Sequence, residues 1–433
     1  MSVGRPSIAG LAGFRGWSAL RHRNYRLFFA GQLTSLIGTW MMTVAQSWLV
    51  LQLTGDPLML GLVAAVQFGP VLVLGLFGGV IADALPKRRT LVVTQAVAMV
   101  LGLIMSALVL TNTVAVWHVL VIAFLLGCRN AIDMPVRQAF SVDLVGRADI
   151  SNAVALNSAM FNGARVIGPA VAGITIGLFG VGPAFLIDAV SYLAVIVALL
   201  AMREQDLLTR PGIERPQTMT AVLVNLREGL VYVRRTKVVL AAMIVVGLVA
   251  GFGMNFTVVI PPLTQMVLHS DATGYGFLMA STGVGSVIAA LGIAFSGRTT
   301  PLVIAFGAIT LGVAEVVLGI SSSFAIALVA MFFAGVGGIA MAATANTVIQ
   351  LTVPDQLRGR VLSVYTTVFA GSTPVGGLVT GAIASSFGAA VAVGLGGAAS
   401  LLTGLVSISW LRGRTMRPPK AVPVPEAAVE RAV

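Results

Sequence analysis

The sequence predicts an all-α polytopic membrane protein with twelve transmembrane helices in two six-helix halves. The first observation is composition: the 433 residues are 57% hydrophobic and only 10% charged, whereas soluble globular chains carry about 25% charged residues. The second is a mean hydropathy of +0.97. The third is that apolar stretches recur along the whole chain, each near or above the roughly 20 residues that cross a bilayer.

The apolar stretches fall into two sets of six. The first set covers residues 27–50, 58–82, 90–111, 115–137, 151–179 and 182–202. The second set covers residues 238–262, 272–296, 301–320, 324–349, 361–386 and 389–411. We therefore expect an N-terminal segment (1–26), a first helix bundle (27–202), a linker (203–237), a second bundle (238–411) and a tail (412–433).

The linker contains one amphipathic stretch. Its apolar residues recur at helical spacing at Met219, Val222, Leu226 and Leu230. Such a helix lies either flat on the inner leaflet or against the cytoplasmic ends of the spans, and the pattern leaves both arrangements open.

Basic residues are distributed unevenly among the connections. The net charge is +12, yet the connections at 51–57, 112–114, 180–181, 263–271, 321–323 and 387–388 contain no Lys or Arg. The other connections and both tails hold the basic residues. The positive-inside rule therefore places both termini and the linker in the cytoplasm, as expected for a multi-pass protein of a bacterial inner membrane. The excess of basic over acidic residues therefore reflects membrane topology and attraction to anionic lipids. We expect no nucleic-acid partner.

Several functional classes are excluded by what the sequence lacks. A single cysteine, Cys128, excludes an internal disulfide scaffold, and three scattered histidines do not form a metal-ligand pattern. No phosphate-binding Walker motif and no zinc-protease motif is present. The linker is shorter than the roughly 50 residues of the smallest domains, which argues against a sensor. We therefore expect a transporter with no cofactor and no metal, and not an intramembrane enzyme.

Charged residues inside the spans are the sharpest functional signal. Arg129 and Asp133 are four residues apart, and Arg137 continues the same helical face. The cluster is either self-neutralising or part of a gate, so Arg129 and Arg137 are gate candidates and Asp133 is a candidate for proton coupling. Arg165 lies near mid-depth of its span, where a lone arginine needs a partner or a wet cavity.

Two further acids stand alone in the outer halves of their spans. Neither Asp188 nor Glu315 has a Lys or Arg of its own span within one helical turn. A desolvated carboxylate takes up a proton more readily than an exposed one, which is what a proton-coupled carrier needs. Both acids are therefore candidates for proton coupling; the alternative is that they only pack helices together.

Polar residues outline a predicted cavity. In the first span Gln32, Ser35, Thr39, Thr43 and Gln46 follow one helical face. Polar side chains in lipid-embedded helices face the bundle interior or water. The residues predicted to line the cavity are Gln32, Thr39, Gln46, Asn162, Arg165, Asn255, Asn346 and Tyr365.

The two halves repeat each other weakly in sequence. Residues 127–180 align without a gap on residues 335–388, and identities include Gly127/Gly335, Phe161/Phe369, Gly168/Gly376 and Gly180/Gly388. Both windows contain a span, a basic loop and a span. A repeat of this kind is typical of transporters built from two parallel halves.

Three stretches carry a resemblance to a known family. Residues 79–89 contain Gly79 and Asp83 followed by basic residues, although Ala84 and Pro86 depart from the usual pattern. The second stretch is residues 135–169, which end in Gly168-Pro169. The third comprises residues 226–235 and 358–363. Together they resemble the major facilitator superfamily, and most of all its twelve-span branch of drug and siderophore exporters, which includes macrolide-efflux and enterobactin-exporter proteins.

The resemblance implies the major facilitator fold and a secondary active transporter. Asp83, Gly168 and Pro169 would belong to its gating elements. The implied activity is export of amphiphilic small molecules across the inner membrane by alternating access, coupled to proton entry; a proton-coupled importer of a small nutrient is the alternative, because the residues do not give the direction. The expected partners are a small-molecule substrate, protons and the lipid bilayer, with the protein acting as a monomer.

Overall fold

The computed structural model describes residues 15–74, 85–207, 219–296 and 300–412. Asp83, one of the predicted gating residues, lies outside them. The predicted fold class is confirmed, because the described residues form helices without strands and include twelve helical segments long and apolar enough to cross a membrane.

The first half contains six spanning helices. A short 3-10 helix, η2 (Arg15–Arg21), precedes them, and η4 (Glu204–Asp206) follows them. The six are α1 (Arg23–Thr54), α2 (Pro57–Leu74), α4 (Lys87–Leu110), α5 (Val116–Asp143), α6 (Gly146–Phe179) and α7 (Val181–Leu200).

The second half follows the linker helix α8 (Met219–Arg235). Its first span consists of α9 (Lys237–Phe252), α10 (Phe256–Pro262) and the π-helical turn η5 (Leu263–Val267). The remaining spans are α11 (Ala272–Ser296), α12 (Leu302–Ile320), α13 (Phe324–Thr352), α14 (Asp355–Phe387) and α15 (Ala389–Leu411).

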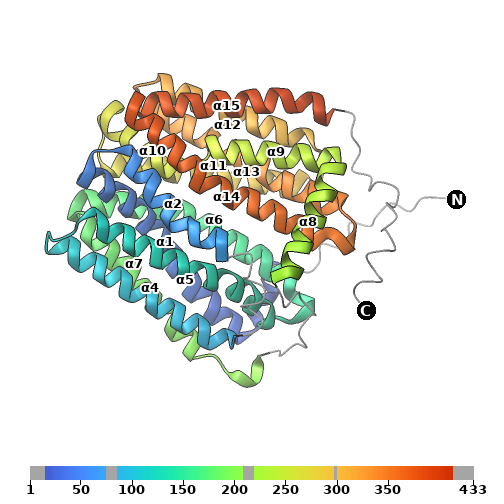
Figure 1. Ribbon diagram of the computed structural model, residues 1–433. Coiled ribbons are helices and arrows are strands. Elements are labelled where there is room, and N and C mark those ends of the chain that lie inside the picture. The colour runs from blue at the N-terminus through green and yellow to red at the C-terminus, as the bar shows by residue number, and fades with distance from the viewer. Residues whose placement is uncertain (1–14, 75–84, 208–218, 297–299, 413–433) are drawn as a thin grey trace.

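The last turn of α15 and the helix α8 lie at the same end of the bundle (Figure 1). We call this side the terminal end and the opposite side the distal end. The connections that lack Lys and Arg lie at the distal end. Two of them turn on equivalent glycines: Gly180, with φ 81°, joins α6 to α7, and Gly388, with φ 92°, joins α14 to α15. This backbone region is easily reached only by glycine.

The halves are related as the sequence repeat predicts. Gly168 on α6 packs against the backbone of α1 at Ile37, and Gly376 on α14 packs in the same way against α9 at Gly251. The helices therefore correspond pairwise: α1 to α9 and α10, α2 to α11, α4 to α12, α5 to α13, α6 to α14, and α7 to α15.

The halves meet along two glycine-rich seams in the distal part of the bundle. On the first, α6 packs against α11, where a methyl group on Gly173 would lie 2.9 Å from Cα of Gly276. On the second, α2 packs against α14, where Gly61 contacts the carbonyl of Gly377. Small residues allow such close approach of membrane helices. These seams hold the distal end closed.

The first span of the second half is interrupted, contrary to the continuous stretch 238–262 that hydropathy predicts. The helix stops at Phe252 and restarts at Phe256. The Asn255 side chain donates hydrogen bonds to the carbonyl of Gly251 (2.6 Å) and to Oγ1 of Thr380 on α14 (3.3 Å). The apolar composition continues through the break, so a hydropathy pattern cannot reveal it.

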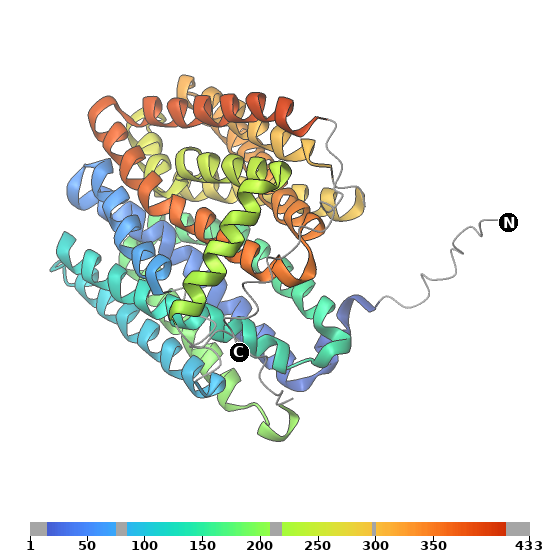
Figure 2. The same ribbon diagram turned by 45° about the vertical axis from the view of Figure 1, so that its right-hand side comes forward.

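The linker helix packs against the terminal end of the bundle (Figure 2). Gly229 contacts the backbone of Arg360 on α14, Glu228 forms an ion pair with Arg360, and Tyr232 donates to the carbonyl of Thr352 (3.3 Å). These contacts favour packing on the ends of the spans over a helix lying free on the leaflet. Of the predicted apolar face, Leu230 is exposed, and the side chains from Met219 to Leu226 lie outside the described part.

Candidate functional site

A cavity of about 250 Å³ lies between the two halves. Residues of α1, α2, α10 and α14 line it together with the broken segment before α10. Its polar lining includes Thr43, Gln46, Gln67, Thr257 and Thr373. Because both halves contribute, a molecule bound here would touch both of them. The volume is slightly below the range of about 300–1,000 Å³ found for small-molecule sites.

Gln46 is the predicted cavity residue that lines this space directly. Its side chain donates a hydrogen bond to Oε1 of Gln67 on α2 (3.2 Å). Gln67 was not predicted, although it is the only strongly polar side chain in the described part of α2. Trp40, also missed, forms the wall of the cavity nearest to α6.

Arg165 packs against that wall. Its guanidinium carbon lies 5.7 Å from the centre of the Trp40 ring, a cation–π arrangement. Within the described part of the chain it has no ion pair and no side-chain hydrogen bond. Arg165 is therefore a half-buried positive charge without an ion pair among the described residues. It stacks on Trp40, which lines the cavity, but does not line the cavity itself.

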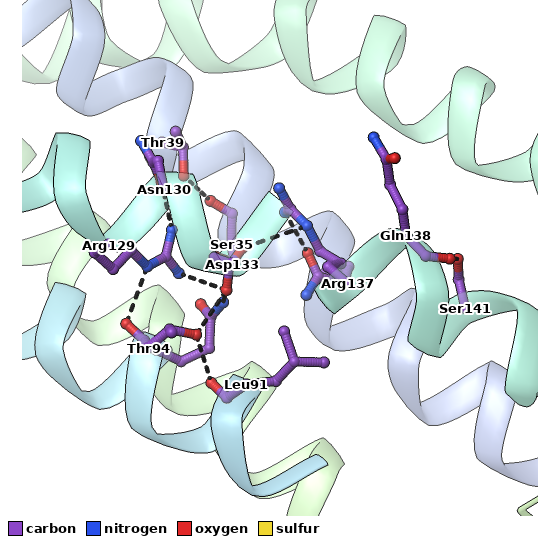
Figure 3. A network of polar contacts seen from close by, with 12 residues as sticks. Ser35, Thr39, Leu91, Thr94, Arg129, Asn130, Asp133, Arg137, Gln138 and Ser141 are labelled. Carbon is purple, nitrogen blue, oxygen red and sulfur yellow. Dashed lines mark hydrogen bonds and ion pairs between the residues drawn. The ribbon is translucent and has the colours of Figure 1, made fainter. Parts of the chain in front are cut away.

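A polar network fills the interior of the first half around Asp133, which is fully buried (Figure 3). One carboxylate oxygen accepts from Thr94 (2.7 Å) and Gln95 (2.9 Å) of α4 and lies 3.4 Å from Arg129. The other lies 3.4 Å from Nε of Arg137. The sequence predicted the cluster on α5, but α4 supplies its two neutral donors.

The network continues into α1 and α7. Arg137 donates to Oε1 of Gln32 (3.2 Å), so Gln32 belongs to this network and does not line the central cavity. Thr39 contacts the hydroxyl of Tyr192 (3.4 Å), and the guanidinium of Arg129 stacks 5.6 Å from the centre of the Tyr192 ring. Arg129 and Arg137 thus tie three helices of the first half to α5.

Asp188 lies deeper, where α7 packs on α1 and α4. It is 1% exposed, and its Oδ1 has no hydrogen-bond partner within the described residues. Oδ1 lies against Gly38 of α1, and a small apolar cavity lined by Ala98, Leu101 and Met105 of α4 adjoins the side chain.

Glu315 occupies the interior of the second half. It is 3% exposed, and its Oε2 is likewise unpartnered within the described part. The side chain packs between Gly397 of α15 and Gly253, the first residue of the helix break. The break therefore places the backbone of the first span of this half beside the acid.

The remaining predicted residues take up other positions. Asn162 donates to its own helix at Ser158 (2.8 Å), Asn346 accepts a bond from Gln350, and Tyr365 donates to the carbonyl of Ala342 (3.1 Å). Asn255 is used at the helix break. Gly168 and Pro169 form part of the packing of α6, Gly168 against α1 and the Pro169 carbonyl against Gly276 of α11.

A family model described as a transmembrane secretion effector of the major facilitator type matches residues 14–426. The chain belongs to this family. This transporter is also similar to the staphyloferrin A transporter of Staphylococcus aureus, with 25% identity over 84% of this chain and 90% of the relative. It is 29% identical to the multidrug efflux pump Tap of Mycolicibacterium fortuitum, over 84% of this chain and 89% of the relative.

The fold of the transporter agrees with a solved member of the same architecture. The crystal structure of the nucleoside transporter NupG superimposes on this chain with a TM-score of 0.71 and 12% sequence identity. The superposition covers 90% of this chain and 100% of the NupG chain. The chain is thus a multi-pass membrane transporter of the major facilitator superfamily, in the branch of drug and siderophore exporters, and not an enzyme.

Proposed function

We propose that this transporter exports amphiphilic small molecules, drug-like compounds or siderophores, across the bacterial inner membrane in exchange for protons. The observation that carries the proposal is the central cavity, to which both halves contribute walls. A site shared by two related halves is the arrangement that alternating access requires. The relatives named as a multidrug efflux pump and a siderophore transporter support export.

The contacts between the halves support a rocking cycle. Both glycine seams lie in the distal part, and so does the hydrogen bond from Thr273 of α11 to the carbonyl of Gly173 (3.3 Å). Within the described residues, no hydrogen bond or ion pair joins the halves at the terminal end. With the terminal end in the cytoplasm, this is the state closed to the outside, and opening the seams releases the substrate.

Proton coupling needs an acid that is charged in one step and neutral in another. Asp133 is held between two arginines and two neutral donors, an environment that favours a permanent charge. Asp188 and Glu315 are buried, and each has one carboxylate oxygen with no hydrogen-bond partner among the residues that the structure describes. We therefore assign coupling to Asp188 and Glu315, and gate support to Asp133.

The charge of Arg165 narrows the substrate class. An unpaired guanidinium inside a membrane is costly unless water or a ligand compensates it. Because it stacks on Trp40, a residue of the cavity wall, it is suited to a carboxylate, sulfonate or other anionic group on an otherwise apolar molecule. We therefore expect the transporter to favour anionic amphiphiles over cationic ones.

Transport into inverted membrane vesicles tests the proposal. The cytoplasmic face is outside in such vesicles, so an exporter fills them. We expect pyrenesulfonate to accumulate when the interior is made acidic, and the accumulation to vanish when the gradient is collapsed. Vesicles without the protein are the control. Gradient-driven accumulation only in right-side-out vesicles would establish the importer instead, and no gradient dependence in either would contradict coupling.

A further inference from the structure

The two halves contain one equivalent three-helix junction each. In the first half, α7 packs against α1 and α4. In the second half, α15 packs against α9 and α12. These are corresponding helices, because α1, α4 and α7 are the first, third and sixth spans of their half, as α9, α12 and α15 are of theirs.

Both junctions have the same local geometry. In the first, a methyl group added to Gly38 of α1 would collide with Oγ of Ser191 and lie 3.0 Å from Oδ1 of Asp188. In the second, a methyl group added to Gly253 would collide with Oγ of Ser400 and lie 3.1 Å from Oε2 of Glu315. Each junction therefore brings a serine hydroxyl and a carboxylate oxygen against the bare face of one glycine.

The two carboxylates come from different helices. Asp188 is on the sixth span of its half, as is Ser191, whereas Glu315 is on the third span of its half and Ser400 is on the sixth. The repeat in the sequence cannot show this correspondence, since the acids do not align. The two junctions are equivalent in the position of the carboxylate oxygen beside the glycine, and not in the helix that carries the acid.

Both sites are deeply buried, and their polar atoms are incompletely paired within the described residues. The carboxylate oxygens named above have no hydrogen-bond partner within the described residues, and neither does Oγ of Ser400, whose residue is 0% exposed. Ser191 donates to the backbone carbonyl of Asp188 (2.6 Å). A buried polar atom without a partner is costly, and a proton on the carboxylate removes the cost of burying its charge.

The charged and titratable groups around the sites differ. Asp188 faces Arg129 from α5 and the hydroxyl of Tyr192 on its own helix; the contacts recorded for α1 and α4 are glycine, methionine, alanine and leucine. No charged group in the described part of the chain acts on Glu315, whose recorded neighbours are Gly253 at the helix break and Gly397 on α15. Two side-chain oxygens do not form the six to eight oxygen shell typical of Ca²⁺, so the ligand that fits is a proton.

We propose that each half carries its own proton site, Gly38–Ser191–Asp188 in one and Gly253–Ser400–Glu315 in the other, and that one transport cycle moves two protons. Each carboxylate accepts a proton from water on the outer side, forming one O–H bond, and returns it to water on the inner side. The count of two protons rests on the proposed function, whereas the two sites do not.

Infrared spectroscopy of the purified full-length protein tests the sites without transport. The carbonyl stretching band of a protonated carboxyl group lies at a different wavenumber from the bands of an ionised carboxylate. Exchange of the acidic proton for deuterium in D₂O shifts this carbonyl band. We expect the carbonyl band of protonated carboxyl groups to contain two components that change across a pH titration. Asp188→Asn should remove one component and Glu315→Gln the other. Asp355→Asn and Glu204→Gln, which change exposed acids, are the matched controls and should remove neither.

The transport stoichiometry tests the count. The steady-state accumulation of pyrenesulfonate in inverted vesicles is measured against the imposed pH difference, with the membrane potential clamped at zero. We expect the logarithm of the accumulation ratio to rise with a slope of two, falling to one in either single variant that still transports.

The outcomes separate the inference from the proposed function. Two carboxyl components without gradient-driven transport would leave the sites standing and refute coupled export. Gradient-driven transport with a slope of one, or with a carboxyl component assigned to only one of the two acids, would overturn the paired sites while export stands. Loss of both components in a single variant would also overturn them. Gly38→Ala and Gly253→Ala, which keep the acids but crowd them, should each shift only the component of their own half.

Discussion

At the scale of single residues, the first half depends on Asp133 to hold two arginines inside the membrane. The carboxylate is fully buried and contacts Arg129, Arg137, Thr94 and Gln95. A buried ion network contributes little net stability when complete, but removing one partner leaves an uncompensated charge. The network is therefore sensitive to the loss of Asp133, the acid that pairs with both arginines.

We expect Asp133→Asn to destabilise the protein by about 3–5 kcal/mol, because two arginines lose their counter-charge. Thermal unfolding in detergent micelles measures this. Asp355→Asn removes an exposed acid that pairs with Arg358 and should change stability by no more than about 0.5 kcal/mol. Equal stability of the two variants would mean that the arginines are compensated by other groups.

Arg165 gives a prediction about specificity. We expect Arg165→Gln to reduce the preference for pyrenesulfonate over pyrenemethylammonium at least tenfold, since a charge-assisted contact is lost. Arg165→Lys should restore part of the preference. Competition between the two probes in inverted vesicles measures it, with Arg89→Gln, an exposed arginine at the start of α4, as the control. An unchanged preference in Arg165→Gln would show that the cation only packs on Trp40.

The sequence predicts individual residues well only where the signal lies on one helix. The spacing of Arg129, Asp133 and Arg137 predicts their mutual contacts. The donors from α4 belong to another helix than Asp133, and Ser400 and Glu315 come from helices far apart in the chain. Common residue types such as Ser and Thr carry no pattern of their own. Gln32 and Thr39 share a predicted stripe with Thr43 and Gln46, yet only Thr43 and Gln46 of these four line the central cavity, because the stripe runs the length of the helix and the cavity adjoins only part of it.

At the scale of helices, glycines determine how closely the spans approach each other. Along α6, Gly168 and Gly173 contact other helices directly, whereas Gly163 has open space where a side chain would lie. On α14, Gly376 contacts the backbone of α9 at Gly251. The same residue type thus has opposite roles on one helix.

We expect Gly376→Ala to cost about 1–3 kcal/mol through overpacking of α14 against α9. Gly168→Ala should be costly for the same reason, because its methyl group would meet α1. Gly163→Ala is the matched control and should cause no loss, since alanine is the better helix former. Thermal unfolding and the yield of monodisperse protein measure the effects. Similar stability of the Gly163 and Gly376 variants would contradict the packing described here.

Hydropathy predicts the existence and order of the helices, because span length and apolar content are properties of each segment alone. It does not predict the break at residues 253–255, where apolar composition continues while Asn255 takes over the hydrogen bonding. It also predicts the linker helix without deciding its position. The contacts of Glu228 and Tyr232 with the second half are tertiary.

At the scale of the whole molecule, the halves are joined mainly in the distal part, while the cavity and both proposed proton sites lie inside the bundle. The packed seams and the cavity shared by both halves are the observations on which the proposed alternating access rests. In the proposed cycle the distal end opens when the terminal end closes.

Distances between pairs of spin labels, measured by electron–electron double resonance, test whether the two ends open in opposition. The labels replace exposed residues in a Cys128→Ser background, at Gln52 and Ser385 for the distal end and at Val154 and Ser363 for the terminal end. On addition of pyrenesulfonate at alkaline pH, we expect the distance at the distal end to lengthen and the distance at the terminal end to shorten. Distances that stay unchanged, or that lengthen at both ends together, would contradict it.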